Sequence, residues 1–166
     1  MSALVPDKSA PIVDVLIESP LWEKEPLAAG TVERAIAAAA EAIDAPLGEV
    51  VVMLADDETI RGLNRAWRKI DKPTNVLSFP AARTPGIEPL MLGDIVIAHE
   101  TLTRECEEED RVFLNHLAHL AVHGFLHLMG YDHQSDSEAE AMEQLETAIL
   151  ARLDMPDPYL ARDLGA

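Results

Sequence analysis

The chain of 166 residues has the length of a single domain with one hydrophobic core. Apolar residues make up 48% of it and charged residues 26%, which excludes collagenous, disordered and disulfide-framework proteins. The 30 acidic residues outnumber the 13 lysines and arginines, and the net charge of -17 by itself argues against a polyanionic ligand such as nucleic acid.

The N-terminal part of the chain predicts strands that alternate with helices. The run Ile12–Ile17 predicts a strand because branched side chains favour extended backbone, and the alanine-rich segment Thr31–Ile43 predicts a helix. Glu49–Leu54 predicts a second strand. Either Asp56 or Asp57 can cap the helix that follows. The apolar face of that helix consists of Ile60, Leu63 and Trp67.

The rest of the chain predicts two more strands and a long central helix. The strands are Val76–Phe79 and Asp94–Ala98, and the loop between them is rich in proline. From about Glu107 to Met129 the pattern is helical and increasingly apolar, as in a buried helix, and Gly130 ends it. Ser135 begins a capping box for the last helix. The apolar stripe of that helix consists of Ala139, Met142, Leu145 and Ile149.

These elements predict one α+β domain over residues 1–166, in which helices pack against a small mixed sheet. We expect this domain to work in the cytoplasm. Cys106 is the only cysteine, so the chain can form no internal disulfide and no thiolate metal site. The N-terminal segment has no basic region typical of a signal peptide, and no apolar run approaches the roughly 20 residues of a membrane span.

Histidines are concentrated near the end of the central helix. His123 and His127 lie one helical turn apart, so their imidazoles can converge on a single ion. Gly130 can adopt the positive φ that reverses the chain after a helix, which could bring His133 over the same site. Three imidazoles with an open fourth position are the usual ligand set of a catalytic zinc ion.

The string from His123 to His133 has the ligand spacing of the metzincin peptidases, H-E-x-x-H-x-x-G-x-x-H. Gly124 stands where a metzincin carries the glutamate that serves as general base. The metal geometry is therefore kept without the peptidase machinery, which argues against peptide hydrolysis.

The other polar residues of this region have mainly structural interpretations. We expect His116 and His119 to pack or to orient neighbours, and His99 to be an ordinary exposed histidine. The acidic run Glu105–Asp110 predicts a solvated face at the N-terminal end of the central helix. Its carboxylates should raise the pKa of Cys106, which is therefore a poor candidate nucleophile.

Several blocks of the chain, in order, resemble the YbeY-type endoribonucleases, a family that acts in ribosomal RNA maturation. The match extends over roughly residues 50 to 150. The blocks that carry it are Leu63-Asn64 through Trp67-Arg68, Lys72–Pro80, Leu92–Ile97, the histidine string, and the last helix with Glu138 and Glu140.

The resemblance implies one Zn²⁺ per chain, held by His123, His127 and His133. It also implies catalytic roles for Arg68 and His123, and single-strand-specific cleavage of RNA. The expected task is maturation of the 16S rRNA 3′ end and ribosome quality control, with the small ribosomal subunit and its proteins as partners. Position 75 is Asn where many relatives carry Asp, so we expect no acid–base role there.

Two alternatives stay open at this point. The same three-histidine metal could serve a hydrolase of another phosphodiester or an amide, or the metal could be structural in a non-catalytic ribosome assembly factor. The proton acceptor is also open, because Asp132 is a candidate base, a candidate partner of a metal ligand and a candidate turn residue. The nucleophile is either water or the 2′-hydroxyl of the RNA. Zinc, nickel and copper all accept imidazole.

The charge of the chain is unevenly distributed. Residues 61–83 contain six basic residues and one acidic residue, a net charge of +5, whereas the remaining residues carry -22. Because salt screens exposed charges beyond about 8 Å, RNA near this segment would respond mainly to the local field. We therefore expect weak, salt-sensitive affinity for free RNA, with targeting supplied by ribosomal partners.

Overall fold

The computed structural model describes residues 10–82, 84–87 and 91–159. The strands of this part are β1 (Ile12–Ile17), β2 (Glu49–Ala55), β3 (Val76–Pro80) and β4 (Met91–Ala98). The helices are η2 (Pro20–Lys24, a 3-10 helix), α1 (Ala28–Ile43), α2 (Asp57–Arg68), α3 (His99–Glu109), α4 (Phe113–Leu128) and α5 (Asp136–Arg152).

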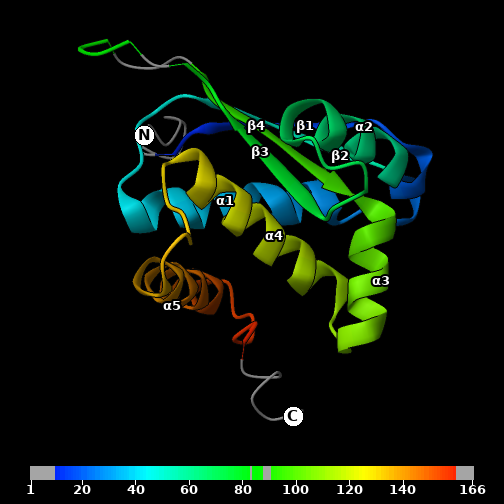
Figure 1. Cartoon of the computed structure of the whole chain (residues 1–166). Helices are drawn as coiled ribbons and strands as arrows, with labels where there is room; N and C mark the ends of the chain where they lie inside the picture. The colour runs from blue at the N-terminus through cyan, green and yellow to red at the C-terminus, as the bar shows by residue number, and fades with distance from the viewer. Residues whose placement is uncertain (1–9, 83, 88–90, 160–166) are drawn as a thin grey trace, which may run out of the picture.

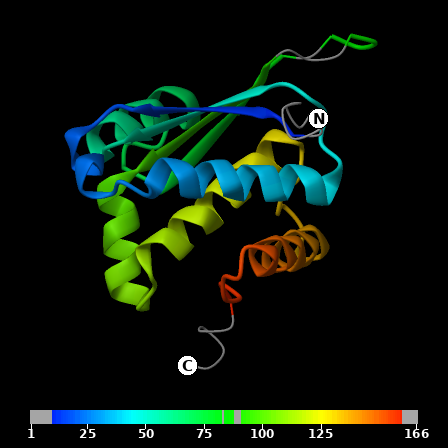
Figure 2. The same ribbon diagram turned by 180° about the vertical axis from the view of Figure 1, so that it is seen from behind.

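A four-stranded mixed sheet with the order β1-β2-β4-β3 forms the centre of the molecule. β1, β2 and β4 run parallel, whereas β3 pairs antiparallel with the outer side of β4. α1 and α4 cover one face of this sheet and α2 lies on the other, as Figures 1 and 2 show. β4 is buried over most of its length because both of its faces are covered. The predicted fold class, a single α+β domain with a small mixed sheet, is confirmed.

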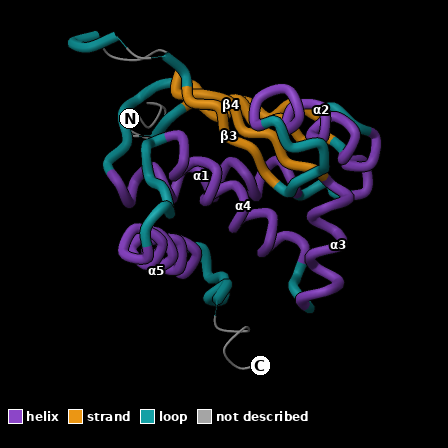
Figure 3. The backbone as a smooth tube through the Cα atoms, viewed as in Figure 1, coloured by secondary structure: helices purple, strands orange, loops and turns teal. Residues whose placement is uncertain are grey.

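Two sets of apolar side chains hold the layers together. The larger set lies between the sheet and α1, α4 and α5, and includes Ile36, Ile95 and Phe125. The smaller set lies under α2 and includes Ile60 and Val96. Figure 3 shows α5 packed beside α1 and α4, on their side that faces away from the sheet. Among the described residues, no helix is both long and apolar enough to cross a membrane.

The predicted central helix from Glu107 to Met129 is wrong in its N-terminal part. Two helices, α3 and α4, occupy this region, and α3 begins directly at the end of β4. Asp110 ends α3 in the left-handed conformation, with φ of 53°, and the chain turns before α4 starts. Asp can adopt this conformation without glycine, so the sequence carries no strong break signal there.

Two further expectations are wrong: the exposure of His99 and the placement of the acidic run. His99 is buried rather than exposed, because its ring packs against Trp22, and burial lowers its pKa. Trp67, which shares the predicted apolar face of α2, is exposed. The acidic run Glu105–Asp110 lies at the C-terminal end of α3 rather than at the start of the central helix. Glu107, Glu108 and Asp110 are exposed as expected of a solvated face, whereas Glu105 is half-buried.

Gly124 is a point of close contact between α4 and the sheet. A Cβ atom placed there would lie 3.0 Å from Ile95 Cγ2, 3.2 Å from Ser78 Oγ and 3.3 Å from Val76 Cγ2. The Ser78 hydroxyl also donates a hydrogen bond to the Gly124 carbonyl at 2.9 Å. Position 124 therefore faces β3 and β4, and a glutamate has no room there without displacing α4 from the sheet.

Substitution of Gly124 by alanine is expected to destabilise the protein relative to the matched variant Gly62→Ala. Both glycines lie inside helices, so each gains about 1 kcal/mol of helix propensity. A Cβ at Gly62 meets nothing within 4 Å, whereas one at Gly124 is overpacked, at a cost of about 1–3 kcal/mol. Urea unfolding of the two variants measures this difference, and equal free energies of unfolding would contradict the packing constraint.

Candidate metal centre

His123 and His127 project from the last two turns of α4, and His133 follows the turn that ends this helix. Gly130, with φ of 97°, allows the chain to reverse. Its N–H donates to the His127 carbonyl and the Tyr131 N–H donates to the Leu126 carbonyl, the paired bonds of a Schellman motif. The predicted chain reversal at Gly130 is present, and it brings His133 beside the two helical histidines.

The three imidazoles form one group, with a ligand nitrogen from each lying within 4.8 Å of the others. The Nε2 atoms of His123 and His127 are 3.1 Å apart, and the ring of His133 lies 5.8 Å and 5.1 Å from the two rings by centroid. Burial, followed by the neighbouring histidines, lowers the pKa of His127 and favours its neutral form. This group could hold a metal ion, since neutral imidazole is a common ligand.

Arg68 and the three histidines line the same cavity, which has a volume of about 460 Å³. Arg68 is the last residue of α2 and is exposed. Ser78 of β3 and Asn75 just before that strand contribute to the wall, as does Asp132. Asp132 accepts a hydrogen bond from the His133 backbone N–H at 2.8 Å, an interaction that stabilises the turn.

Hydrogen bonds at both ends of α2 fix the position of this helix, and therefore that of Arg68. At the N-terminal end of α2, Asp57 accepts hydrogen bonds from the backbone N–H and the hydroxyl of Thr101 on α3. At its C-terminal end, the buried Asn64 side chain donates to the Lys72 carbonyl and holds the following segment against the helix. With α2 and the following segment held in this way, Arg68 at the end of α2 lies beside β3 at the cavity.

Glu146 of α5 is the residue of the site that the sequence interpretation missed. It is 1% exposed and accepts hydrogen bonds from His123 Nδ1 at 2.6 Å, from His119 Nε2 at 3.2 Å and from the Tyr159 hydroxyl. Burial alone would raise its pKa, but the hydrogen bonds from the two histidines lower it to about 2. The sequence held one signal for it: Glu146 lies on the same helical face as the apolar residues Met142 and Ile149. Because an unpaired charge is rarely buried, a carboxylate on an apolar face indicates a buried partner.

The contact between Glu146 and His123 has a chemical consequence. The Nδ1 atom of His123 carries the proton that it donates to the carboxylate, so its Nε2 atom, which faces His127, keeps a lone pair. A carboxylate behind an imidazole in this way fixes both the tautomer and the ring orientation of a metal-binding histidine.

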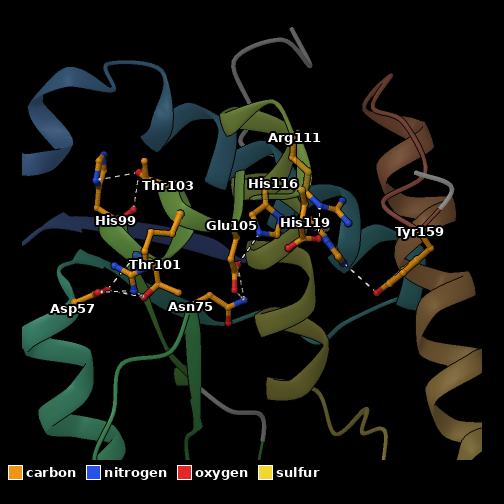
Figure 4. A network of polar contacts seen from close by, with 12 residues as sticks. Asp57, Asn75, His99, Thr101, Thr103, Glu105, Arg111, His116, His119 and Tyr159 are labelled. Carbon is orange, nitrogen blue, oxygen red and sulfur yellow. Dashed lines mark hydrogen bonds and ion pairs between the residues drawn. The ribbon is translucent and has the colours of Figure 1, made fainter. Parts of the chain in front are cut away.

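A second carboxylate holds the start of α4. His116 Nε2 donates to Glu105 Oε1 at 2.8 Å, and the Asn75 amide donates to both oxygens of Glu105 at 3.0 and 3.2 Å. Figure 4 shows these residues as a bridge between α3, α4 and the start of β3. His116 and His119 are thus buried and bonded to carboxylates, as expected of packing or orienting histidines. Burial and then Glu105 raise the pKa of Cys106 to about 11, which confirms that it is unsuited to act as a nucleophile.

Comparison with known proteins assigns the chain to a family. The family model described as "Endoribonuclease YbeY" matches residues 22–154. The chain belongs to the YbeY family. A protein named Endoribonuclease YbeY from Bradyrhizobium sp. is 55% identical over 96% of this chain and 98% of its own length. Another of that name from Rhodopseudomonas palustris is 56% identical over 92% of this chain and 83% of its own length.

A solved structure supports the fold of this YbeY family member. The solution structure of TM1509 from Thermotoga maritima is similar with a TM-score of 0.50 and 24% identity, and the match covers 86% of this chain and 92% of that one.

The Glu105 bridge gives a prediction for stability against pH. Burial raises the pKa of Glu105, but the hydrogen bonds from His116 and Asn75 outweigh it, so the pKa lies below its ordinary value of 4.5. The ionised carboxylate therefore contributes stability above pH 4.5, and this contribution is lost as the pH falls through the folded-state pKa. We expect Glu105→Gln to lower the free energy of unfolding by roughly 1 kcal/mol at pH 7 and progressively less in acid.

Urea unfolding at stepped pH values measures this effect. The exposed neighbour Glu108 on the same helix provides the control variant Glu108→Gln, which should change stability little. If Glu105→Gln lowers the free energy of unfolding as much at pH 3 as at pH 7, the carboxylate charge is not the source of the stabilisation.

Proposed function

We propose that this protein is a zinc-dependent endoribonuclease that cleaves single-stranded RNA during maturation of the 16S rRNA 3′ end and in ribosome quality control. The observation that carries the proposal is the convergence of three histidines and one arginine on a single cavity in a chain of the YbeY family. The proposed setting is the cytoplasm, with the small ribosomal subunit and its proteins as partners.

The histidine group fits a zinc ion. His123, His127 and His133 each offer one ring nitrogen as a ligand atom, and imidazole suits zinc well. Among the residues that the structure describes, the group has three members, the number of protein ligands typical of a catalytic rather than a structural zinc site. This favours the enzyme over the alternative of an assembly factor with a structural metal. One ion per chain follows from the single group found in the described part.

The residues around the cavity divide the work of phosphodiester cleavage. A metal ion bound by the histidines supplies Lewis-acid stabilisation of phosphoryl charge. Arg68 adds a planar guanidinium that donates to the phosphoryl oxygens as their negative charge increases. Glu146 keeps His123 in the tautomer that presents Nε2 to the cavity. Since Gly124 faces the sheet, position 124 cannot provide the general base of a peptidase, and this argues against the amide-hydrolase alternative.

Loss of Arg68 is expected to slow RNA cleavage strongly. Removal of one donor that stabilises transition-state charge typically costs about 10²–10³-fold in rate, so Arg68→Ala should fall in this range while remaining folded. Arg152 is also exposed and also ends a helix, so Arg152→Ala is the matched control and should cleave like the wild type.

The assay uses single-stranded rRNA fragments with and without a chelator, and it includes His123→Ala. The proposal requires that chelation and His123→Ala both abolish cleavage, and that metal analysis finds about one ion per chain. Equal, chelator-insensitive cleavage by the wild type and both site variants would mean that the activity is a contaminant, and the nuclease proposal would fail.

The role of Glu146 predicts a change in metal affinity. Loss of a carboxylate partner of a metal-binding histidine typically weakens metal binding about 10–100-fold, so Glu146→Gln should weaken the zinc affinity by this amount. Competition with a chromophoric chelator measures the Kd, and Glu140→Gln on the exposed face of the same helix is the control.

Thermal unfolding of the metal-free variant checks that it is folded. Should Glu146→Gln not fold, Tyr159→Phe removes one hydrogen bond to Glu146 and provides a milder change in the same direction. A folded variant with wild-type zinc affinity would rule out the orienting role.

A further inference from the structure

An apolar groove lies on the α2 side of the sheet, beside the histidine cavity. It has a volume of about 730 Å³, and its described walls come from α2, β2, β3 and β4. Trp67 and Phe79 form one part of the wall, and Met53 and Met91 contribute to it from the sheet. The groove exists because α2 is short and covers only part of this face.

Trp67 is the unusual residue of this groove. Its side chain is 71% exposed, whereas Trp22, the other tryptophan of the chain, is 2% exposed and donates its indole N–H to the Ala55 carbonyl. The Trp67 ring meets Phe79 edge to face, with centroids 5.9 Å apart, so Phe79 supports the indole on one side only. A large aromatic ring held in place but left open to solvent is typical of a binding surface.

The groove adjoins the histidine cavity at the end of β3. Pro80 lines both of them, and the consecutive residues Trp67 and Arg68 line the groove and the cavity respectively. A linear ligand with one phosphate beside Arg68 therefore places its next unit against Trp67.

The charges around the cavity favour a strand that runs from Arg68 towards the groove over one that runs towards α5. Acidic side chains line the two small cavities that share His123 on the α3 and α5 side: Glu105, Glu109, Glu143 and Glu146. Basic residues on α2 and the segment after it are Arg65, Arg68, Lys69 and Lys72, besides Arg61, which is paired with Asp71. A polyanion that enters the cavity is thus repelled from the α5 side and attracted to the α2 side.

The groove itself is suited to a base rather than a phosphate. Among its described lining residues the one charged side chain is that of Asp94, which repels phosphate, and most of the others are apolar. Base–aromatic stacking needs a free π-face on the base and tolerates any sequence.

We propose that this groove binds an unpaired nucleobase of the RNA strand that runs on from the cleaved phosphate, with the base stacked on the Trp67 indole. This inference rests on the proposed nuclease function. It also provides a physical reason for a preference for single strands, because a base within a duplex is already stacked and cannot enter the groove.

The test compares two non-cleavable single-stranded probes, a 2′-O-methyl oligouridine and an abasic oligomer with the same phosphate backbone. Trp67→Leu keeps an apolar side chain but removes the stacking surface, and it should weaken oligouridine binding by about 5- to 100-fold while leaving abasic binding unchanged. Trp67→Phe should recover most of the loss. Val112→Ala, at an equally exposed apolar residue between α3 and α4, is the control and should bind both probes like the wild type.

Tryptophan fluorescence provides an independent readout. Oligouridine should quench the emission of Trp67 in the wild type but cause no quenching in Trp67→Phe, since Trp22 is buried. If Trp67→Leu loses equal affinity for both probes, or loses affinity for neither, the base site is overturned. The groove would then be left to a protein partner. RNA cleavage is measured in parallel, so a protein that cleaves single-stranded RNA but fails this test refutes the base site alone. A wild type that does not cleave refutes the proposed function.

Discussion

The direct contact of α4 with the sheet at Gly124 is the constraint on which the site depends. Without a side chain at this position, the helix comes close enough for its carbonyl to accept from Ser78 on β3. The helix and the strand then form two walls of one cavity, with His123 and His127 on one side and the end of α2 on the other. A bulkier residue would move the histidines away from Arg68, so the glycine determines the distance between the histidine group and Arg68.

Carboxylates from two other helices hold the histidine helix in place. Glu105 of α3 binds His116 at the start of α4, and Glu146 of α5 binds His119 and His123 further along. Each buried charge is offset by imidazole or amide donors, which is the condition under which a carboxylate can lie in a protein interior. The histidines of α4 therefore have two roles. His116 and His119 anchor neighbouring helices, whereas His123 and His127 face the cavity.

The sequence predicted the strands, the fold class and the convergence of the histidines because these features depend on local patterns. Branched runs, a capping box and the i, i+4 spacing with Gly130 are all readable within a few residues. The break at Asp110, the burial of His99 and the role of Glu146 were not predicted, since each depends on contacts between segments far apart in the chain. His99 is buried only because Trp22 packs on it, and Glu146 is paired only because α5 returns to α4. The exposure of Trp67 was not predictable for the same reason. Helical spacing shows on which face of α2 the residue lies, but not whether the sheet extends far enough to cover it.

The distribution of charge connects these features to the substrate. A net charge of -17 would repel RNA if it were spread evenly, but acidic α5 and basic α2 lie on opposite sides of the histidine cavity. Because salt screens charges beyond about 8 Å, an RNA strand at the cavity responds separately to acidic α5 and to basic α2. The local electric field therefore points the strand from α5 towards α2. Repulsion from α5 then orients the strand, and attraction by α2 holds it. The acidic surface elsewhere on the molecule disfavours contact with a polyanion outside this cavity, so the local charge at the cavity matters more than the total charge.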